Sequence, residues 1–249
     1  MPVMASSMRP GRGAQLPYQI LAGVIPVPKG WLVASAKFQG ATISPETPRL
    51  SKAFLDVLDY KPAYKVVAIY APIGLPSGPI SRGRMCDREA RRILGIPRAN
   101  AIASAPPRPA LGCTTYDEAR AASGGHLNPI RWRQLPKIAE VDAAIAPYWQ
   151  RVVFEVHPEL SFFQLGEDNP LRYPKYTEAG MLERTALLEA RLPGVERILD
   201  AEIPGISRVH LLDAAACLWT ARRIAAHAIH RLPEDPEWDA AGLRMEIVR

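Results

Sequence analysis

The chain has 249 residues, of which 48% are hydrophobic and 22% charged, and this composition excludes a disordered protein. It contains no run of about 18 apolar residues, so we expect no transmembrane helix and no membrane partner. Three scattered cysteines without a CxxC pair argue against a disulfide framework and a thiolate metal site, and they favour a cytoplasmic location. The net charge of +6 permits a polyanionic partner without requiring one.

The first elements form a hairpin after a short tail. Residues 1–16 are basic and rich in small residues, so we expect a flexible tail followed by a single domain over residues 17–249. Two β-prone segments, 18–27 and 31–38, are joined by a PKG turn and predict a β-hairpin. Residues 41–44 are typical of a short third strand.

Helical and strand-like segments alternate along the rest of the chain. Residues 48–60 place apolar side chains at helical spacing, and 65–73 is an apolar run typical of a strand buried on both faces. Gly95 is the expected end of the next helix, and Thr114 is the expected N-cap of the one after it. These further elements are helices at 85–95, 114–125 and 129–148, a strand at 152–158, and helices at 178–192 and 206–232. The order predicts an α/β fold, a mixed sheet opened by a hairpin and covered by helices.

The strand at 152–158 carries ionisable side chains. Because strand side chains alternate, Glu155 and His157 share one face, while Glu159 follows just beyond Pro158, which ends the strand. Two interpretations are open. The polar face points into a site at the carboxyl end of the strand, where α/β folds tend to place sites, or the strand lies at a sheet edge with a solvated face.

Asp213 is the one ionisable residue within LLDAAACLW, residues 211–219. Its neighbours on a helix are small or apolar, so this helix face packs against another element. A carboxylate in such a place needs a cationic partner or a metal ion. The alternative is a partly exposed aspartate at the helix edge, paired with Arg222 or His210.

A basic cluster follows the segment PIGLPSGP. Four arginines are candidate phosphate contacts for a nucleic acid, because the forked donors of arginine suit phosphate groups: Arg84, Arg88, Arg91 and Arg108. The first three recur at helical spacing, and Arg108 stands apart between prolines. The alternative is a solvated helix face whose arginines pair with neighbouring acids.

Seven segments, in order, carry a family resemblance: PIGLP (72–76), RGRMCDREARRILG (82–95), APPRPA (105–110), YDEA (116–119), LPKIAEVD (135–142), FEVHPELSF (154–162) and LLDAAACLWTARR (211–223). Together they resemble the predicted ribonuclease-H-like (RNase-H-like) nucleases, long catalogued as domain of unknown function four-twenty-nine. The resemblance covers nearly the whole chain.

The resemblance implies an RNase-H-like fold, in which a β-hairpin opens a mixed five-stranded sheet with helices on both faces. It also implies a nuclease that binds Mg²⁺ or Mn²⁺ through carboxylates and hydrolyses phosphodiesters. Glu155 and Asp213 match two of the family's metal-binding and catalytic positions. His157 and Glu159 match its EVHPE motif and are expected to support the metal ligands or to transfer protons.

Two aspartates that the family pattern contains are missing from this chain. The first strand reads GVIPVPKGW, which places Ile25 at one of these positions, and the later segment IYAPIGL places Tyr70 at the other. With these charges lost, two bound cations would be poorly neutralised, and metal affinity should fall.

Three functions are compatible with these features. The first is a nuclease with an altered site, in which Glu159, Glu140 or Asp142 replaces the missing ligands. The second is a catalytically inactive RNase-H-like protein that acts as a nucleic-acid-binding or regulatory module. The third is a stable fold for a small-molecule ligand, with its acids in internal salt bridges, and an Asp213 paired with an arginine would favour it.

Overall fold

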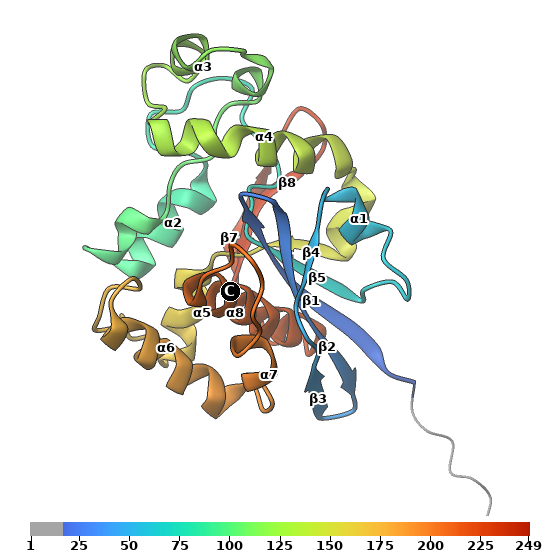
Figure 1. The fold of residues 1–249 in the computed structure, drawn as a ribbon. Helices are drawn as coiled ribbons and strands as arrows, with labels where there is room; N and C mark the ends of the chain where they lie inside the picture. The colour runs from blue at the N-terminus through green and yellow to red at the C-terminus, as the bar shows by residue number, and fades with distance from the viewer. Residues whose placement is uncertain (1–16) are drawn as a thin grey trace, which may run out of the picture.

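The first strands form an antiparallel hairpin that opens a mixed sheet. In the computed structural model, β1 (Gln19–Val27) pairs antiparallel with β2 (Gly30–Gln39), which in turn pairs antiparallel with β3 (Thr42–Pro45). On its other side β1 runs parallel to β5 (Val66–Ile69), and β5 runs parallel to β6 (Val153–Glu155). The order β3-β2-β1-β5-β6 confirms the predicted hairpin and mixed sheet (Figure 1).

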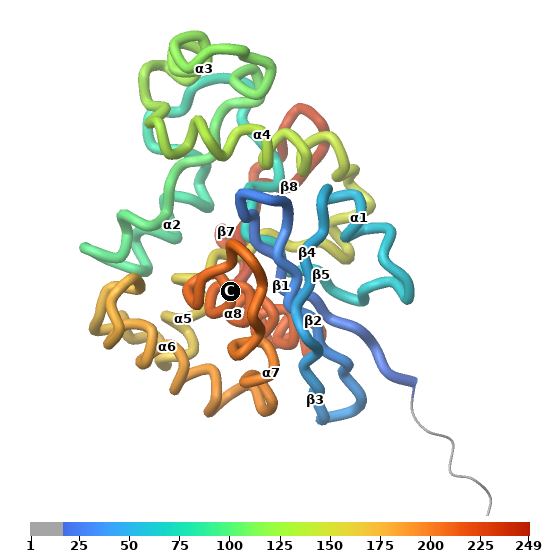
Figure 2. Tube along the Cα trace, viewed as in Figure 1, coloured from blue at the N-terminus to red at the C-terminus, as the bar shows by residue number. Residues whose placement is uncertain are grey.

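The structure describes residues 17–249, so the tail predicted at 1–16 lies outside the described residues. Within the described part, no helix is both long enough and apolar enough to cross a membrane. The segment between β5 and β6 carries α2, α3 and α4 and forms a lobe beside the sheet (Figure 2).

Eight α-helices and three short 3₁₀-helices are present among the described residues. The α-helices are α1 (Leu55–Leu58), α2 (Met85–Leu94), α3 (Tyr116–Ala122), α4 (Pro129–Ala144), α5 (Pro158–Leu165), α6 (Glu178–Arg191), α7 (Glu196–Leu199) and α8 (Arg208–Ala225). The 3₁₀-helices are η1 (Arg98–Ala101), η2 (Arg108–Gly112) and η3 (Pro147–Arg151). Gly95 ends α2 as expected, whereas the side chain that caps α3 is Thr115 and not Thr114.

Helices cover both faces of the sheet because the strand side chains alternate. Leu21 and Ile25 of β1 pack in the cluster that contains the inner face of α8. Their neighbours Ile20 and Val24 point to the opposite side, where they pack with Phe54 beside α1. Both faces are therefore buried, as the continuous apolar runs of β1 and β5 require.

Three segments differ from the sequence predictions. The helix predicted at 48–60 is wrong in its first part, because β4 (Arg49–Ser51) pairs with β2 before the short α1 begins. The strand predicted at 152–158 ends at Glu155, because Pro158 is the first residue of α5. Proline at that position lacks only an N–H that the helix would leave unpaired, so the turn into a helix costs little.

The last helix is also shorter than the predicted range, 206–232. It ends at Ala225, and His227 adopts a left-handed conformation with φ 56° just after it. The chain then forms a hairpin from β7 (Arg231–Trp238) and β8 (Arg244–Val248). The sequence RLPEDPEW did not predict β7, because proline and acidic residues are depleted in strands.

Gly23 allows β1 and α8 to touch backbone to backbone. A Cβ atom at this position would lie 2.2 Å from Leu218 N and 2.3 Å from Ala214 O. We therefore expect Gly23→Ala to lower the free energy of unfolding by about 3 kcal/mol or more. Urea unfolding followed by circular dichroism measures this change. Gly78→Ala is the control, because its Cβ would meet nothing within 4 Å, and an equal loss in both variants would contradict the packing argument.

Candidate functional site

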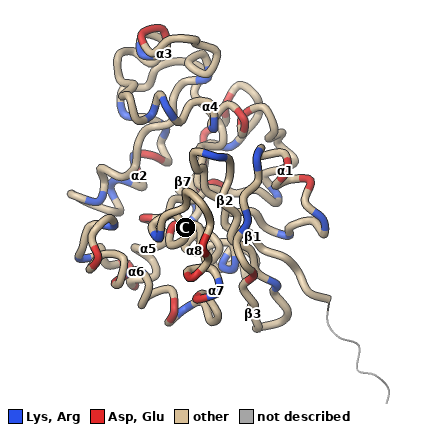
Figure 3. The backbone as a smooth tube through the Cα atoms, in the orientation of Figure 1, with Lys and Arg blue, Asp and Glu red and all other residues tan. Residues whose placement is uncertain are grey.

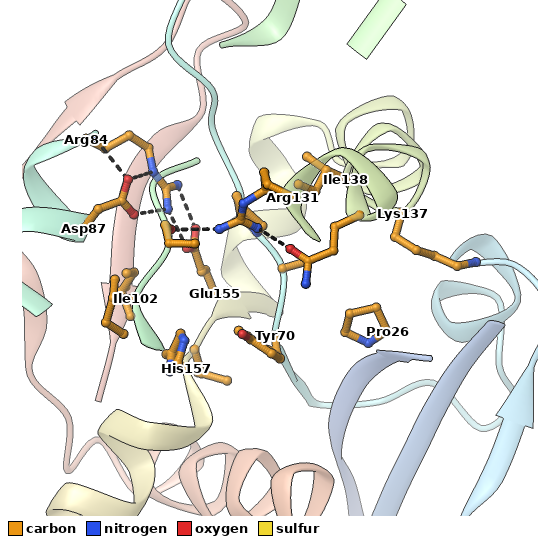
Figure 4. A pocket seen from close by; sticks show the side chains of 16 residues that line it. Pro26, Tyr70, Arg84, Asp87, Ile102, Arg131, Lys137, Ile138, Glu155 and His157 are labelled. Carbon is orange, nitrogen blue, oxygen red and sulfur yellow. Dashed lines mark hydrogen bonds and ion pairs between the residues drawn. The ribbon is translucent and has the colours of Figure 1, made fainter. Parts of the chain in front are cut away.

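The carboxyl ends of β1, β5 and β6 and the start of α5 meet at a small cavity. Its volume is about 40 Å³, which leaves room for little more than water (Figure 4). Its wall includes Pro26, Tyr70, Arg84, Arg131, Glu155, His157 and Ile247. The cavity lies where the resemblance places catalytic carboxylates, and it brings together Tyr70, Glu155 and His157.

Arg84 is a buried ion-pair partner and not a surface phosphate contact, with 1% of its surface exposed. Its Nη2 lies 2.6 Å from Oε1 of Glu155 and 2.9 Å from Oδ1 of Asp87. Its Nη1 donates to Oε2 of Glu155 at 2.9 Å and to the carbonyl oxygens of Ile73 and Gly74. Figure 4 shows the guanidinium between the two carboxylates. The strand carboxylate that was expected to bind metal is thus already neutralised by the protein.

The two carboxylates respond differently to the same arginine. Burial raises the pKa of Glu155 above its ordinary value, and Arg84 only partly offsets this. Burial would also raise the pKa of Asp87, but Arg84 and the backbone N–H donors of Ala105 and Arg84 lower it overall. The pKa of Arg84 rises despite burial, because both acids stabilise its charge. The cluster is therefore stable only as a unit.

His157 is the N-cap of α5 and is neutral at neutral pH. Its Nδ1 accepts a hydrogen bond from Glu159 N at 3.2 Å, and its ring packs edge-on against Tyr70 with ring centres 4.7 Å apart. Burial, helped by the positive charge of Lys175, lowers the pKa of His157 to about 3. Its ring therefore holds the helix start and carries no charge toward the cavity.

Glu159 and Asp213 each have a cationic partner as well. Oε1 of Glu159 lies 2.9 Å from Nη2 of Arg184, which is fully buried, and Oδ2 of Asp213 lies 2.7 Å from Nζ of Lys175. Burial raises the pKa of Asp213, and Lys175 opposes the shift. The partner of Asp213 is thus a lysine from the segment before α6, and neither an arginine nor His210.

The donor set does not fit a divalent metal site. Among residues 17–249, no three His, Cys, Asp or Glu side chains come together in a group that could hold an ion. Glu155 and Asp213 pair with different cations. Ile25 is buried in the core, Glu140 accepts hydrogen bonds from Trp31 and Lys137, and Asp142 pairs with Arg108, so none of these replaces a missing ligand.

The other predicted phosphate contacts also have partners within the protein. Arg88 donates to the carbonyl oxygen of Gly83, and Arg91 donates to the carbonyl oxygen of Ile102 and to the Ser104 hydroxyl. Arg108 forms ion pairs with Asp142 and with Asp239, at 2.8 Å and 2.6 Å. Arg88 and Arg91 therefore bond within the segment between β5 and β6, whereas Arg108 also joins this segment to Asp239, just after β7.

A larger cleft adjoins the small cavity and was not foreseen from the sequence. It has a volume of about 460 Å³ and shares Tyr70, Arg131 and His157 with the small cavity. Three cationic side chains line it: Arg98, Arg131 and Lys175. Figure 3 shows the blue of lysine and arginine on α2 and at the start of α4. The one local pattern that could have pointed to this cleft is NPIRW, residues 128–132, in which a capped helix start is followed by an arginine.

Comparisons with known proteins give one match. A family model described as "Protein of unknown function (DUF429)" matches residues 23–238. No curated protein and no solved structure matches the chain. The matched range contains the small cavity's acids, Arg131 and Lys175.

Removal of Arg84 should expose the cost of the buried acids. Arg84→Met leaves Glu155 and Asp87 without their counter-charge, so we expect a loss of about 3–5 kcal/mol in unfolding free energy at pH 7. The loss should shrink toward pH 5, because Glu155 with its raised pKa binds a proton in the folded state before the unfolded state does. Denaturant unfolding at both pH values measures this.

The exposed Arg92 on the same helix provides the control for this experiment. Arg92→Met should change the unfolding free energy by less than about 0.5 kcal/mol. A loss in Arg84→Met that is the same at both pH values would contradict the proposed role of the carboxylates.

Proposed function

We propose that this chain, which belongs to the DUF429 family, binds nucleic acid through its phosphates without a metal ion and without hydrolysing it. It would then be a catalytically inactive member with RNase-H-like architecture. The observation that carries the proposal is the guanidinium of Arg131. This side chain borders the large cleft and has no carboxylate within ion-pair distance among residues 17–249.

Arg131 differs from Arg84 and Arg108, because those two arginines pair with carboxylates. Its Nη1 donates to Oε1 of Gln134 at 2.9 Å and its Nη2 to the carbonyl oxygen of Ala103 at 2.8 Å, both neutral acceptors. Its Nε has no acceptor within the described structure. Burial lowers the pKa of Arg131, so its charge is only partly compensated. A partly buried cation without an anion favours an anionic ligand.

The surroundings of Arg131 match a phosphate chain better than a single small anion. Arg98 lies on the same cleft, and within residues 17–249 its guanidinium donates only to the carbonyl oxygen of Leu171. Lys175 adds its ammonium group, of which one hydrogen-bond donor is used by Asp213. The cleft volume of about 460 Å³ lies within the range that holds a ligand of nucleotide size.

The state of the acids supports binding without hydrolysis. Glu155 and Asp213 are ion-paired to Arg84 and Lys175, so neither carboxylate is free to bind a metal ion. A nuclease that uses Mg²⁺ or Mn²⁺ remains the prediction of the family resemblance. The geometry favours the inactive alternative, because each acid would first have to lose its cation.

Nucleic-acid binding should depend on Arg131 and on salt. We expect Arg131→Gln to weaken the binding of a fluorescent oligonucleotide about tenfold or more, since a charge-assisted contact is lost. Three phosphate contacts predict that log K falls with log salt concentration with a slope of about −2, and by about 0.7 less steeply in the variant. Fluorescence anisotropy across a salt series measures both values.

Arg92→Gln is the matched control, because Arg92 is exposed and does not line the cleft. Equal weakening by both substitutions would mean that binding reflects net charge only. No binding to the wild-type protein at low salt would reject the proposed function.

The absence of a metal requirement is tested separately. Titration with Mn²⁺ by calorimetry should give no specific heat for the wild-type protein or for Asp213→Ala, and EDTA should leave oligonucleotide affinity unchanged. A stoichiometric Mn²⁺ signal that disappears in Asp213→Ala would favour the nuclease prediction instead.

A further inference from the structure

The rim of the large cleft carries an exposed aromatic ring beside its cations. Tyr176 is 78% exposed and lines the cleft at its edge, next in sequence to Lys175. Ile130, 64% exposed, lines the same cleft one residue before Arg131. Large apolar surfaces left in water at the mouth of a charged cleft are typical of ligand contacts.

Tyr176 is held by a firmly attached segment. The carboxylate of Glu183 accepts hydrogen bonds from the backbone N–H groups of Arg172 and Tyr173, at 2.8 Å and 3.0 Å. Thr177 caps α6 immediately after the tyrosine. The segment and α6 lie in such close contact that a Cβ at Gly180 would be 1.9 Å from Pro174 O. The ring is thus exposed on a fixed support and is ready to receive a ligand without an ordering cost for the backbone.

The spacing of charge and ring suits one nucleotide unit. Nζ of Lys175 lies over one face of the Tyr176 ring, 5.5 Å from its centre, so a phosphate at the lysine would stand next to the ring and a base would stack on the opposite face. Every nucleobase has a flat π-face, and stacking on an aromatic side chain contributes about 1–3 kcal/mol per base. A base in a duplex has both faces covered by its neighbours, so only an unpaired base can use this platform.

We infer that the ligand is single-stranded nucleic acid, with an unpaired base stacked on Tyr176 and its adjacent phosphates on Lys175 and Arg131. This inference rests on the proposed function and specifies its ligand class. No hydrogen-bonding pattern for a particular base is required, so binding is tolerant of base sequence. The positive charge of the cleft alone would accept single and double strands alike, and the ring provides the discrimination.

The experiment compares three labelled oligonucleotides of about 12 nucleotides, a length suited to one binding site. One is a single strand of mixed sequence, the second is the same strand in a duplex, and the third has the same phosphates with abasic sugars. Each is titrated by anisotropy against the wild-type protein, Tyr176→Ala, Tyr176→Phe and Tyr148→Ala. Tyr148 is the matched control, because it is 64% exposed and does not line the cleft.

We expect the wild-type protein to bind the single strand about tenfold or more tightly than the duplex or the abasic strand. Tyr176→Ala should lower single-strand affinity to the abasic level, while Tyr176→Phe and Tyr148→Ala retain it. Circular dichroism checks that each variant is folded. Tyr176→Phe keeps the aromatic ring and removes only the hydroxyl, so it separates loss of stacking from loss of the hydroxyl.

Two results would overturn the inference in distinguishable ways. Equal affinity for normal and abasic strands, with Arg131→Gln still weakening both, would remove the stacking role and leave the proposed function intact. If the wild-type protein bound none of the three oligonucleotides, both the stacking role and the proposed function would be rejected. A preference for the single strand that survives Tyr176→Ala and Tyr176→Phe unchanged would place base recognition elsewhere and reject this site.

Discussion

The ion pair between Arg84 and Glu155 is the interaction on which the site depends. It joins the start of α2 to the end of β6, two elements far apart in sequence, and it also holds the backbone at Ile73. A buried charge is tolerated only when its partner and its hydrogen bonds are all in place. The Glu155 carboxylate at the end of β6 therefore stabilises the fold, and it is not free to act as a metal ligand or a base in the neighbouring cavity.

Two other acids near the site are also neutralised by cationic side chains of the protein. Arg184 neutralises Glu159, and Lys175 neutralises Asp213. In a metal-dependent enzyme, ions from solution would balance such acids, whereas here the chain supplies the positive charge itself. Positive groups that exceed this need then face the large cleft, where only an external anion can complete their neutralisation. Under the proposed function, charge balance would link the ion-paired acids to a surface that binds an anionic ligand.

Much of the fold could be predicted from the sequence, because apolar runs and turn residues act locally. The residues that carry buried charge were also recognisable, since Glu155 and Asp213 stand in apolar surroundings. Their partners were not, because ion pairs such as Lys175 with Asp213 form across long sequence separations. Arg84 was predicted to be a phosphate contact, with a solvated helix face as the alternative, because periodicity shows which residues share a face but not what that face meets.

The C-terminal hairpin has a consequence for how the protein is made. Asp239, just after β7, accepts a hydrogen bond from Leu75 N and pairs with Arg108, and Ile247 of β8 lines the small cavity. Synthesis proceeds from the N-terminus, so β1, β5 and β6 leave the ribosome well before these partners exist. The small cavity can therefore close only after the C-terminal hairpin has been synthesised, so its buried polar groups are completed late in folding.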